Sequence, residues 1–338
     1  MKLSRADAVG HDPSDDDWRN AGFGIYIHWP FCQSKCPYCD FNSHVSARVH
    51  QEQWCEAYLL ELDRAAKATG GRIVDSVFFG GGTPSLMNPA TVAAILDRIR
   101  RNWRPRNSWE VTLEANPSSV EAGRFEGYRD AGVNRVSIGL QSLSEDGLRD
   151  IGRLHSATEG RAAVEIAQRV FSRVSIDLIY GRQHQSPIEW RAELGQAIAL
   201  GTDHLSLYQL TIEQNTAFHA RLMAGGLAGL PSEDRAVELY ELTQDLCSAA
   251  GFDAYEVSNH AKTDAESVHN CLYWQAGDYL GIGPGAHGRL TQDGTRFATE
   301  AERSPARWLE MVTEGGGQRC CEPLSRAERA DEYLIMGL

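Results

Sequence analysis

Short apolar runs, rich in β-branched and aromatic residues, alternate with amphipathic stretches through residue 212 of the chain. The runs that predict strands are Phe23–Trp29, Ser76–Phe79, Glu110–Glu114, Arg135–Ile138, Val174–Ile179 and His204–Tyr208. The stretches with helical spacing are Glu52–Lys67, Thr91–Arg101, Glu121–Asp130, Glu159–Phe171 and Pro187–Leu200. Because such alternation builds a parallel sheet covered by helices, we expect an α/β fold, a partial (β/α)6 barrel, over residues 21–212. Ligands of such barrels gather at the carboxyl ends of the strands.

The strand–helix alternation ends after residue 212. A helical stretch at Glu233–Ala249 is followed by a segment rich in glycine and aromatic residues, and helical patterns return at Ser304–Glu314 and Ala327–Leu338. We therefore expect residues 213–338 to form a C-terminal α+β extension, and the polar residues 1–20 to form an N-terminal tail. The final helical pattern stops without a glycine or asparagine cap, which predicts that the full protein continues.

Composition and charge narrow the class of partner. Hydrophobic residues make up 42% of the chain and charged residues 23%, as in an ordinary globular protein. The net charge of −13 argues against a nucleic-acid-binding face, which needs a basic surface. No run of about eighteen apolar residues predicts a transmembrane segment, and the N-terminus lacks the order of a signal peptide. The eight cysteines then indicate a reducing, cytoplasmic location.

Three cysteines carry the strongest chemical signal. Cys32, Cys36 and Cys39 follow the first predicted strand with the spacing C-x3-C-x2-C, which brings three thiolates to one metal centre. A [4Fe–4S] cluster normally takes four cysteines, but Phe41 stands two residues after Cys39, so one iron would keep an open site. A zinc site is the alternative, although zinc normally adds a second pair of ligands and Cys55 lies in a helical segment without one.

Candidate ligand-binding groups follow several of the predicted strands. The run Phe-Gly-Gly-Gly-Thr-Pro at residues 79–84 lets the backbone approach a ligand and offers N–H groups to it. Glu114 ends the third strand, Gln141 follows the fourth, and Arg153 offers a fork suited to a carboxylate. Asp177 interrupts an apolar strand and needs a ligand or a cation. Each of these residues alone is as well explained by a structural role.

Together and in this order, the motifs resemble the radical S-adenosylmethionine (SAM) superfamily, and within it the anaerobic coproporphyrinogen III oxidase-like branch. The resemblance runs from about Gly24 to Arg289 and implies a [4Fe–4S] cluster on the three cysteines, with SAM chelated by the open iron. The further residues it implies are Tyr26 near the cluster, Tyr38 beside SAM, Gly81, Gly82 and Thr83 at the methionine amino group, Glu114 and Arg153 at the methionine end, and Gln141 and Asp177 at the ribose.

Two features indicate a subgroup of that branch. Coproporphyrinogen oxidases carry a fourth cysteine where this chain has Phe41, and the residues that follow resemble the HemW subgroup, described as heme chaperones. In that subgroup, the motif HNxxYW is associated with heme binding. In this chain the motif includes His269, Tyr273 and Trp274. Imidazole is a common ligand of heme iron, and the aromatic rings offer flat apolar surface.

The residues alone leave other interpretations of this motif open. A histidine beside aromatic residues is more often a hydrogen-bonded core residue than an iron ligand. Cys271 is a second candidate ligand within the motif, and His287, which stands among glycines, is a candidate for the rim of the ligand site. His260 receives no role.

The resemblance implies two functions from different classes. The first is a heme chaperone that transfers heme to acceptor proteins, including respiratory and membrane-associated ones, with the cluster and SAM regulating loading, transfer or homodimer formation. The alternative is a radical SAM oxidoreductase, an oxygen-independent coproporphyrinogen III dehydrogenase that acts on porphyrinogen propionates. Phe41 and the HNxxYW motif favour the chaperone, and the sequence leaves open whether the protein is also an enzyme.

Overall fold

The computed structural model describes residues 18–46, 48–117 and 122–337 of the 338-residue chain. Most of the predicted polar tail, residues 1–17, therefore lies outside the described residues, and so does Glu121, the expected first residue of one helix. The described part begins with the short helix α1 (Trp18–Ala21).

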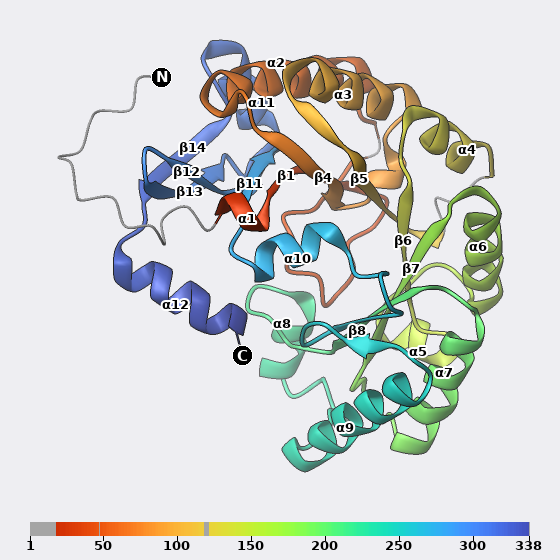
Figure 1. Cartoon of the computed structure of the whole chain (residues 1–338). Coiled ribbons are helices and arrows are strands. Elements are labelled where there is room, and N and C mark those ends of the chain that lie inside the picture. The colour runs from red at the N-terminus through yellow and green to blue at the C-terminus, as the bar shows by residue number, and fades with distance from the viewer. Residues whose placement is uncertain (1–17, 47, 118–121, 338) are drawn as a thin grey trace.

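A twelve-stranded sheet organises the fold, in the order β14-β13-β12-β11-β1-β4-β5-β6-β7-β8-β10-β9 (Figure 1). Its strands are β1 (Phe23–Trp29), β4 (Ile73–Gly81), β5 (Arg104–Ala115), β6 (Arg135–Gln141), β7 (Arg173–Tyr180), β8 (His204–Gln209), β9 (Asp253–Ala254), β10 (Asn259–Ala261), β11 (Asp278–Ile282), β12 (His287–Gln292), β13 (Thr295–Ala301) and β14 (Gln318–Pro323). Two short strands, β2 (Phe31–Cys32) and β3 (His44–Val45), form a separate parallel pair.

The six predicted strands are the parallel core of this sheet. β1, β4, β5, β6, β7 and β8 pair in parallel in chain order, which confirms the predicted α/β fold. The C-terminal part of the chain adds strands at both edges: β11 pairs in parallel with β1, β12 to β14 continue as an antiparallel meander, and β10 pairs antiparallel with β8. The sheet curves, with most helices on its outer side (Figure 1).

The helices cover the sheet and close its interior. They are α2 (Gln51–Thr69), α3 (Pro89–Asn102), α4 (Ala122–Ala131), α5 (Glu145–Asp150), α6 (Ala157–Val170), α7 (Pro187–Ala199), α8 (Ala217–Met223), α9 (Glu233–Ala249), α10 (Val268–Trp274), α11 (Pro305–Glu314), α12 (Arg326–Gly337) and the 3₁₀ turn η2 (Pro84–Leu86). Reciprocal capping boxes start α6 at Ser156, α7 at Ser186 and α12 at Ser325, and satisfy N–H groups of the first turn.

Along each parallel strand, side chains that point into the hydrophobic core alternate with side chains that point into the concave interior of the sheet. In β1, Ile25 and Ile27 are fully buried among the apolar residues of the hydrophobic core, and burying each such side chain contributes about 1.5–3 kcal/mol. The residues that follow each of them, Tyr26 and His28, face the concave interior because successive side chains point to opposite faces of a sheet. The strands thus place polar and aromatic groups of the interior on a rigid apolar support.

Helix α10 occupies the interior at the amino ends of the strands, opposite the cysteine loop. Its N-cap residue Ser267 donates to Glu110 at 3.2 Å, and His269 is hydrogen-bonded to Ser76 at 2.7 Å. Ser76 and Glu110 face each other in the register of β4 and β5, and both precede the carboxyl ends of these strands at Gly81 and Ala115. No helix in the described part of the chain has the length and apolarity needed to cross a membrane.

Candidate functional site

Two cavities occupy the interior of the curved sheet. The first, here the cluster-side cavity, has a volume of about 570 Å³. It is lined by the three predicted cluster cysteines, Cys32, Cys36 and Cys39, and by Tyr38, Gly81, Gly82, Thr83, Glu114, Gln141, Arg153 and Asp177. The fold therefore brings together every residue implied for the cluster and SAM except Tyr26, which lines the second cavity.

Each thiol of the cysteine loop has a polar neighbour. The contacts are Thr83 Oγ1 to Cys32 Sγ at 3.4 Å, Arg153 Nη1 to Cys36 Sγ at 3.5 Å, and Cys39 Sγ to Ser43 Oγ at 3.8 Å. Burial raises the pKa of Cys32 and of Cys39, whereas a metal that binds a thiol deprotonates it. Hydroxyl and guanidinium donors then stabilise the thiolates, so the donor set suits an iron–sulfur cluster.

The three thiols are not arranged around one ion position. In the described ranges, no group of three His, Cys, Asp or Glu side chains is placed to hold a single metal ion. A cubane cluster does not require such an arrangement, since each of its thiolates binds a different iron. The cysteines border a cavity that other polar groups also line.

The glycine-rich turn after β4 offers close approach rather than N–H donors. Gly81 has φ +110°, and a Cβ there would lie 2.6 Å from the ring of His28, so only glycine fits. The N–H groups of Gly82 and Thr83 donate to Trp29 O and Phe31 O. These two N–H groups are therefore engaged within the fold, because the turn extends the pairing with β1 and β2, and a ligand contact through this backbone stays a prediction.

Two carboxyl groups face the cluster-side cavity from neighbouring positions. Glu114 accepts from the N–H of Gly81 at 3.2 Å, and Asp177 accepts from Ser137 Oγ at 2.9 Å. Burial, followed by the negative charge of Asp177, raises the pKa of Glu114 to about 8. Burial also raises the pKa of Asp177. Each carboxyl group therefore tends to hold a proton unless a ligand that carries positive charge or donates hydrogen bonds stabilises its carboxylate.

Gln141 and Arg153 complete the wall opposite the glycine turn. Gln141 adopts φ +65° at the end of β6, and its buried Oε1 has no hydrogen-bond partner among the residues that the structure describes. Such an acceptor needs a donor, which a ligand in the cavity would supply. Arg153 is fixed by a 2.8 Å hydrogen bond from Nη2 to Gly139 O, while Nη1 reaches Cys36.

Glu114→Gln is expected to remove a pH dependence of stability. The folded protein holds a proton on Glu114, with its pKa raised to about 8, that the unfolded chain releases near pH 4.5. The contribution of Glu114 to the free energy of unfolding is fully present below pH 4.5. It falls by up to about 1.4 kcal/mol per pH unit as the pH rises from 4.5 to about 8, and it is lost above that pH. Glutamine imitates the protonated acid, so the variant should gain in free energy of unfolding over wild type between about pH 5 and 8.

Urea denaturation at several pH values measures this difference. The exposed Glu165→Gln on α6 is the matched control and should follow wild type at every pH. If the difference in free energy of unfolding between Glu114→Gln and wild type stayed constant between pH 5 and 8, Glu114 would be charged in the folded protein, and the prediction would be wrong.

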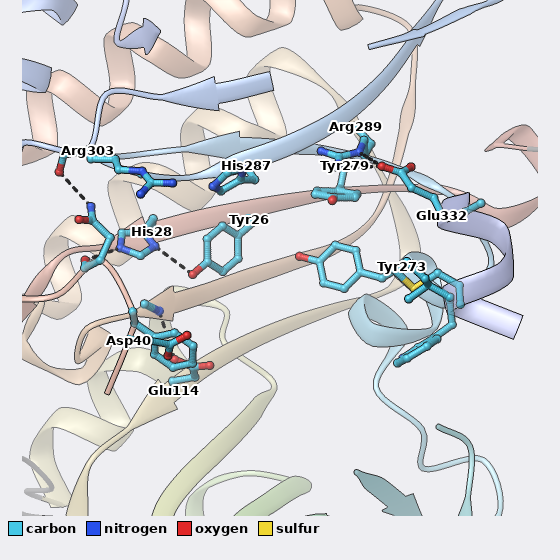
Figure 2. A pocket seen from close by; sticks show the side chains of 18 of the residues that line it. Tyr26, His28, Asp40, Glu114, Tyr273, Tyr279, His287, Arg289, Arg303 and Glu332 are labelled. Atoms are coloured by element: carbon cyan, nitrogen blue, oxygen red, sulfur yellow. Dashed lines mark hydrogen bonds and ion pairs between the residues drawn. The ribbon is translucent and has the colours of Figure 1, made fainter. Parts of the chain in front are cut away.

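The second cavity, here the aromatic cavity, has a volume of about 850 Å³ (Figure 2). Its lining includes Tyr26, His28, Tyr273, Trp274, Tyr279, His287, Arg289, Arg296, Arg303 and Glu332. The rings of Tyr273 and Tyr279 meet edge to face at 4.5 Å between centroids. Glu332 of α12 accepts from Arg289 at 2.8 Å and so connects that helix to β12. The cavity thus combines flat aromatic surface with guanidinium groups.

The HNxxYW motif is divided between this cavity and the core. Tyr273 and Trp274 line the cavity, but His269 is only 1% exposed. Its Nδ1 is hydrogen-bonded to Ser76 Oγ and its Nε2 to the hydroxyl of Tyr273, both at 2.7 Å. Burial lowers the pKa of His269 to about 3. Cys271, the second candidate in the motif, is not among the residues that line either cavity.

Four residues belong to the walls of both cavities: Asp40, Phe41, Gly81 and Glu114. Sequence reasoning had given Phe41 only a negative role, as the residue in place of a fourth cysteine. It also missed His28, Tyr279 and Arg289. The signal available for His28 was its place in β1, two residues from Tyr26 and therefore on the same face of the strand.

Comparisons with known proteins give the family and the fold of the chain. Residues 26–194 match the model of the Radical SAM superfamily. The chain is 42% identical over 345 residues to the mouse mitochondrial radical S-adenosyl methionine domain-containing protein 1, covering 100% of this chain and 77% of the relative. It is 42% identical over 289 residues to the heme chaperone HemW of Escherichia coli, covering 85% and 75%. The coproporphyrinogen III oxidase structure from Escherichia coli, a radical SAM enzyme, superposes with a TM-score of 0.80 at 22% identity, covering 97% of this chain and 78% of that one.

The family match and the fold define the class: the chain belongs to the radical SAM superfamily. The comparison with HemW extends over most of both chains. Within the superfamily, the chain belongs to the HemW family, and it shares its fold with the coproporphyrinogen III oxidase.

Proposed function

We propose that this protein is a heme chaperone, which binds heme and passes it to acceptor proteins. The aromatic cavity carries the proposal, because its volume of about 850 Å³ lies within the roughly 300–1,000 Å³ of ligand sites. A porphyrin is a flat apolar ring with two propionates. Tyr273 and Trp274 offer ring surface to it, and Arg303 offers N–H donors to a carboxylate. The names of the bacterial relatives support the same function.

The cluster-side cavity supports a proposal of two resident cofactors. Cys32, Cys36 and Cys39 would hold the [4Fe–4S] cluster, with their thiolates stabilised by the neighbouring donors. When bound, the cluster and SAM supply one-electron radical chemistry. The unpartnered Gln141 Oε1 accepts from a ligand hydroxyl or amine, and Arg153 presents its fork to a carboxylate. These assignments, and Tyr38, Gly81, Gly82, Thr83, Glu114 and Asp177 as further SAM contacts, rest on the cavity that the residues share.

Tyr26 takes a different place in the proposal from the one expected. It lines the aromatic cavity, and its hydroxyl is hydrogen-bonded to His28 Nδ1 at 3.0 Å. Its ring also lies near Phe78, with 6.2 Å between centroids. We assign Tyr26 to the heme side of the shared interior, next to the wall formed by Gly81 and Glu114.

A heme titration followed in the Soret region tests the chaperone function. Wild type should bind saturably, and Trp274→Ala should bind about two- to tenfold more weakly, since an aromatic contact is worth about 0.5–1.5 kcal/mol. Tyr240→Ala on α9, outside the cavity, is the matched control and should match wild type. Heme-loaded protein mixed with an apo-hemoprotein should then lose its heme to the acceptor. Absence of saturable binding by wild type would overturn the proposal.

The alternative function, a coproporphyrinogen III dehydrogenase, is favoured by the gathering of the SAM candidates around the cysteines. Anaerobic, reduced protein incubated with SAM and coproporphyrinogen III separates the two functions. A chaperone should yield no protoporphyrinogen IX by chromatography. Formation of that product would assign the protein to the enzymes.

Several expectations stay predictions. They are the respiratory and membrane-associated acceptors, the homodimer, the cytoplasmic location and the division of the chain at residues 21 and 213. The animal relatives are named as mitochondrial, so the compartment differs within the family. The net charge of −13 still argues against a nucleic-acid partner.

A further inference from the structure

The histidines near the aromatic cavity differ in what their ring nitrogens bind. His28 has both nitrogens occupied, Nδ1 by the hydroxyl of Tyr26 and Nε2 by Asn42 O, each at 3.0 Å. His269, outside the cavity, has both occupied by Ser76 and Tyr273. Iron coordination needs a nitrogen lone pair that no other partner engages. Neither histidine offers one without breaking a buried hydrogen bond.

His287 is different. It is the first residue of β12, it lines the aromatic cavity, and it is exposed. Within the described part of the chain, no hydrogen bond to its ring is found. Figure 2 shows its ring between Arg303 and Tyr279, on the same side of the cavity as Arg289. Burial lowers the pKa of His287, while Glu300 opposes that shift and Arg303 and Arg289 reinforce it, so the neutral, ligating form prevails at neutral pH.

Hydrogen bonds from the cysteine loop hold the backbone around His287, at the start of β12. Asn42 Nδ2 donates to Pro284 O and to Arg303 O, each at 2.9 Å. Pro284 lies just before β12 and Arg303 just after β13, so Asn42 joins the end of the cysteine loop to the backbone on both sides of this hairpin. Gly285 has φ +75°, and a Cβ there would lie 2.5 Å from Asn42 Nδ2, so glycine is required for this contact. A ligand residue held on such a support keeps its geometry without a bound group.

We propose that the imidazole of His287 is the axial ligand of heme iron in the aromatic cavity, and that His269 is a positioning residue for Tyr273. The proposal rests on the proposed function, namely that this cavity receives heme. The tyrosines that line the cavity are less suited, because the hydroxyls of Tyr26 and Tyr273 are engaged with His28 and His269, and burial raises the pKa of Tyr279 and so disfavours the phenolate that binds iron. Bond formation is a simple coordination of the Nδ1 or Nε2 lone pair to the iron and requires no other reactant.

Titration with two porphyrins distinguishes binding through the iron from binding through the porphyrin ring alone. Heme and iron-free protoporphyrin IX are each titrated into wild type, His287→Ala, His269→Ala and the control His50→Ala, an exposed histidine outside both cavities. For His287→Ala, heme affinity should fall by at least about tenfold, the lower end of what losing even a supporting group of a metal ligand costs. Its affinity for protoporphyrin IX should stay at the wild-type value, because that ring has no iron.

The spectra separate the two roles. His287→Ala should shift the Soret band, and His287→Gly with added imidazole should restore it. His269→Ala should weaken both porphyrins alike and leave the heme spectrum of bound protein unchanged, because it alters only the position of Tyr273. An unchanged spectrum and affinity in His287→Ala, with wild type binding heme, would overturn this inference alone. Failure of wild type to bind either porphyrin would instead overturn the proposed function.

Discussion

Serine at any one of Cys32, Cys36 and Cys39 is expected to abolish assembly of the iron–sulfur cluster. Anaerobic reconstitution of wild type should give about four irons per chain, and each variant close to none. The reason is that the loop supplies only three thiolates and Phe41 stands where a fourth cysteine would be. No sulfur is in reserve on that loop, and a serine hydroxyl is a poor ligand for iron in such clusters.

Iron, acid-labile sulfide and visible absorbance measure the result. Cys320→Ser on the edge strand β14 is the matched control, since Cys320 lines neither cavity, and it should assemble a normal cluster. The melting temperature of each protein before reconstitution shows whether the fold is intact. Full iron and sulfide in Cys36→Ser, or their loss in Cys320→Ser, would contradict the assigned ligand set.

Glu193→Ala is expected to lower the free energy of unfolding by about 3–5 kcal/mol, the usual cost of removing one partner from a buried ion pair. Arg182 Nη2 donates to Glu193 Oε2 at 2.5 Å, and the two side chains are 6% and 7% exposed. Glu193 also accepts from Ser142 Oγ at 2.6 Å and from Leu143 N at 2.7 Å. Its removal leaves the buried guanidinium of Arg182 without a counter-charge, although Nη1 still donates to Ile179 O, and it takes the acceptor away from Ser142 and Leu143.

Urea unfolding followed by circular dichroism measures this effect. Glu189→Gln, one turn earlier on α7, is the matched control, because glutamine preserves its capping box and a surface change costs about 0.5 kcal/mol or less. The double variant Arg182→Met with Glu193→Met should recover part of the loss, since it leaves no unpaired charge. A loss below about 1 kcal/mol in Glu193→Ala would show that water or a rearranged Arg182 replaces the carboxylate.

The same ion pair explains a part of the site that the sequence did not predict. Ser142 and Leu143 follow Gln141, so Glu193 holds the turn on which the left-handed Gln141 stands. The sequence placed Gln141 after a strand, which was enough to suggest a ligand contact. It contained no pattern that connects Gln141 with a glutamate in α7, because that contact depends on how the helix packs on the sheet.

The parallel core was predictable because its strands are apolar runs separated by amphipathic helices. β12, β13 and β14 were missed because they lie toward one edge of the sheet and are not continuous apolar runs: β12 and β13 mix buried with half-exposed or exposed residues, and β14 has no buried residue. One local signal was available. Asp293 and Gly294 both have positive φ and connect β12 to β13, and Asp-Gly between two short runs is a strong hairpin pattern.

The heme motif shows the limit of a motif without its surroundings. His269 and Tyr273 are four residues apart on one helix, so they share a face and bond to each other. Which of them reaches the cavity depends on the docking of α10 against Ser76 at the amino end of β4. That docking joins residues nearly two hundred positions apart, and the helical spacing alone is equally compatible with either orientation.

The wall that the two cavities share has a thermodynamic consequence. Asp40, Phe41, Gly81 and Glu114 face both spaces, and the Phe41 side chain, 60% exposed, has little packing to hold it in one place. If SAM changes the affinity for heme by moving any of these residues, heme must change the affinity for SAM by the same factor. Heme would then promote its own retention or its own release, according to the sign of that single coupling free energy.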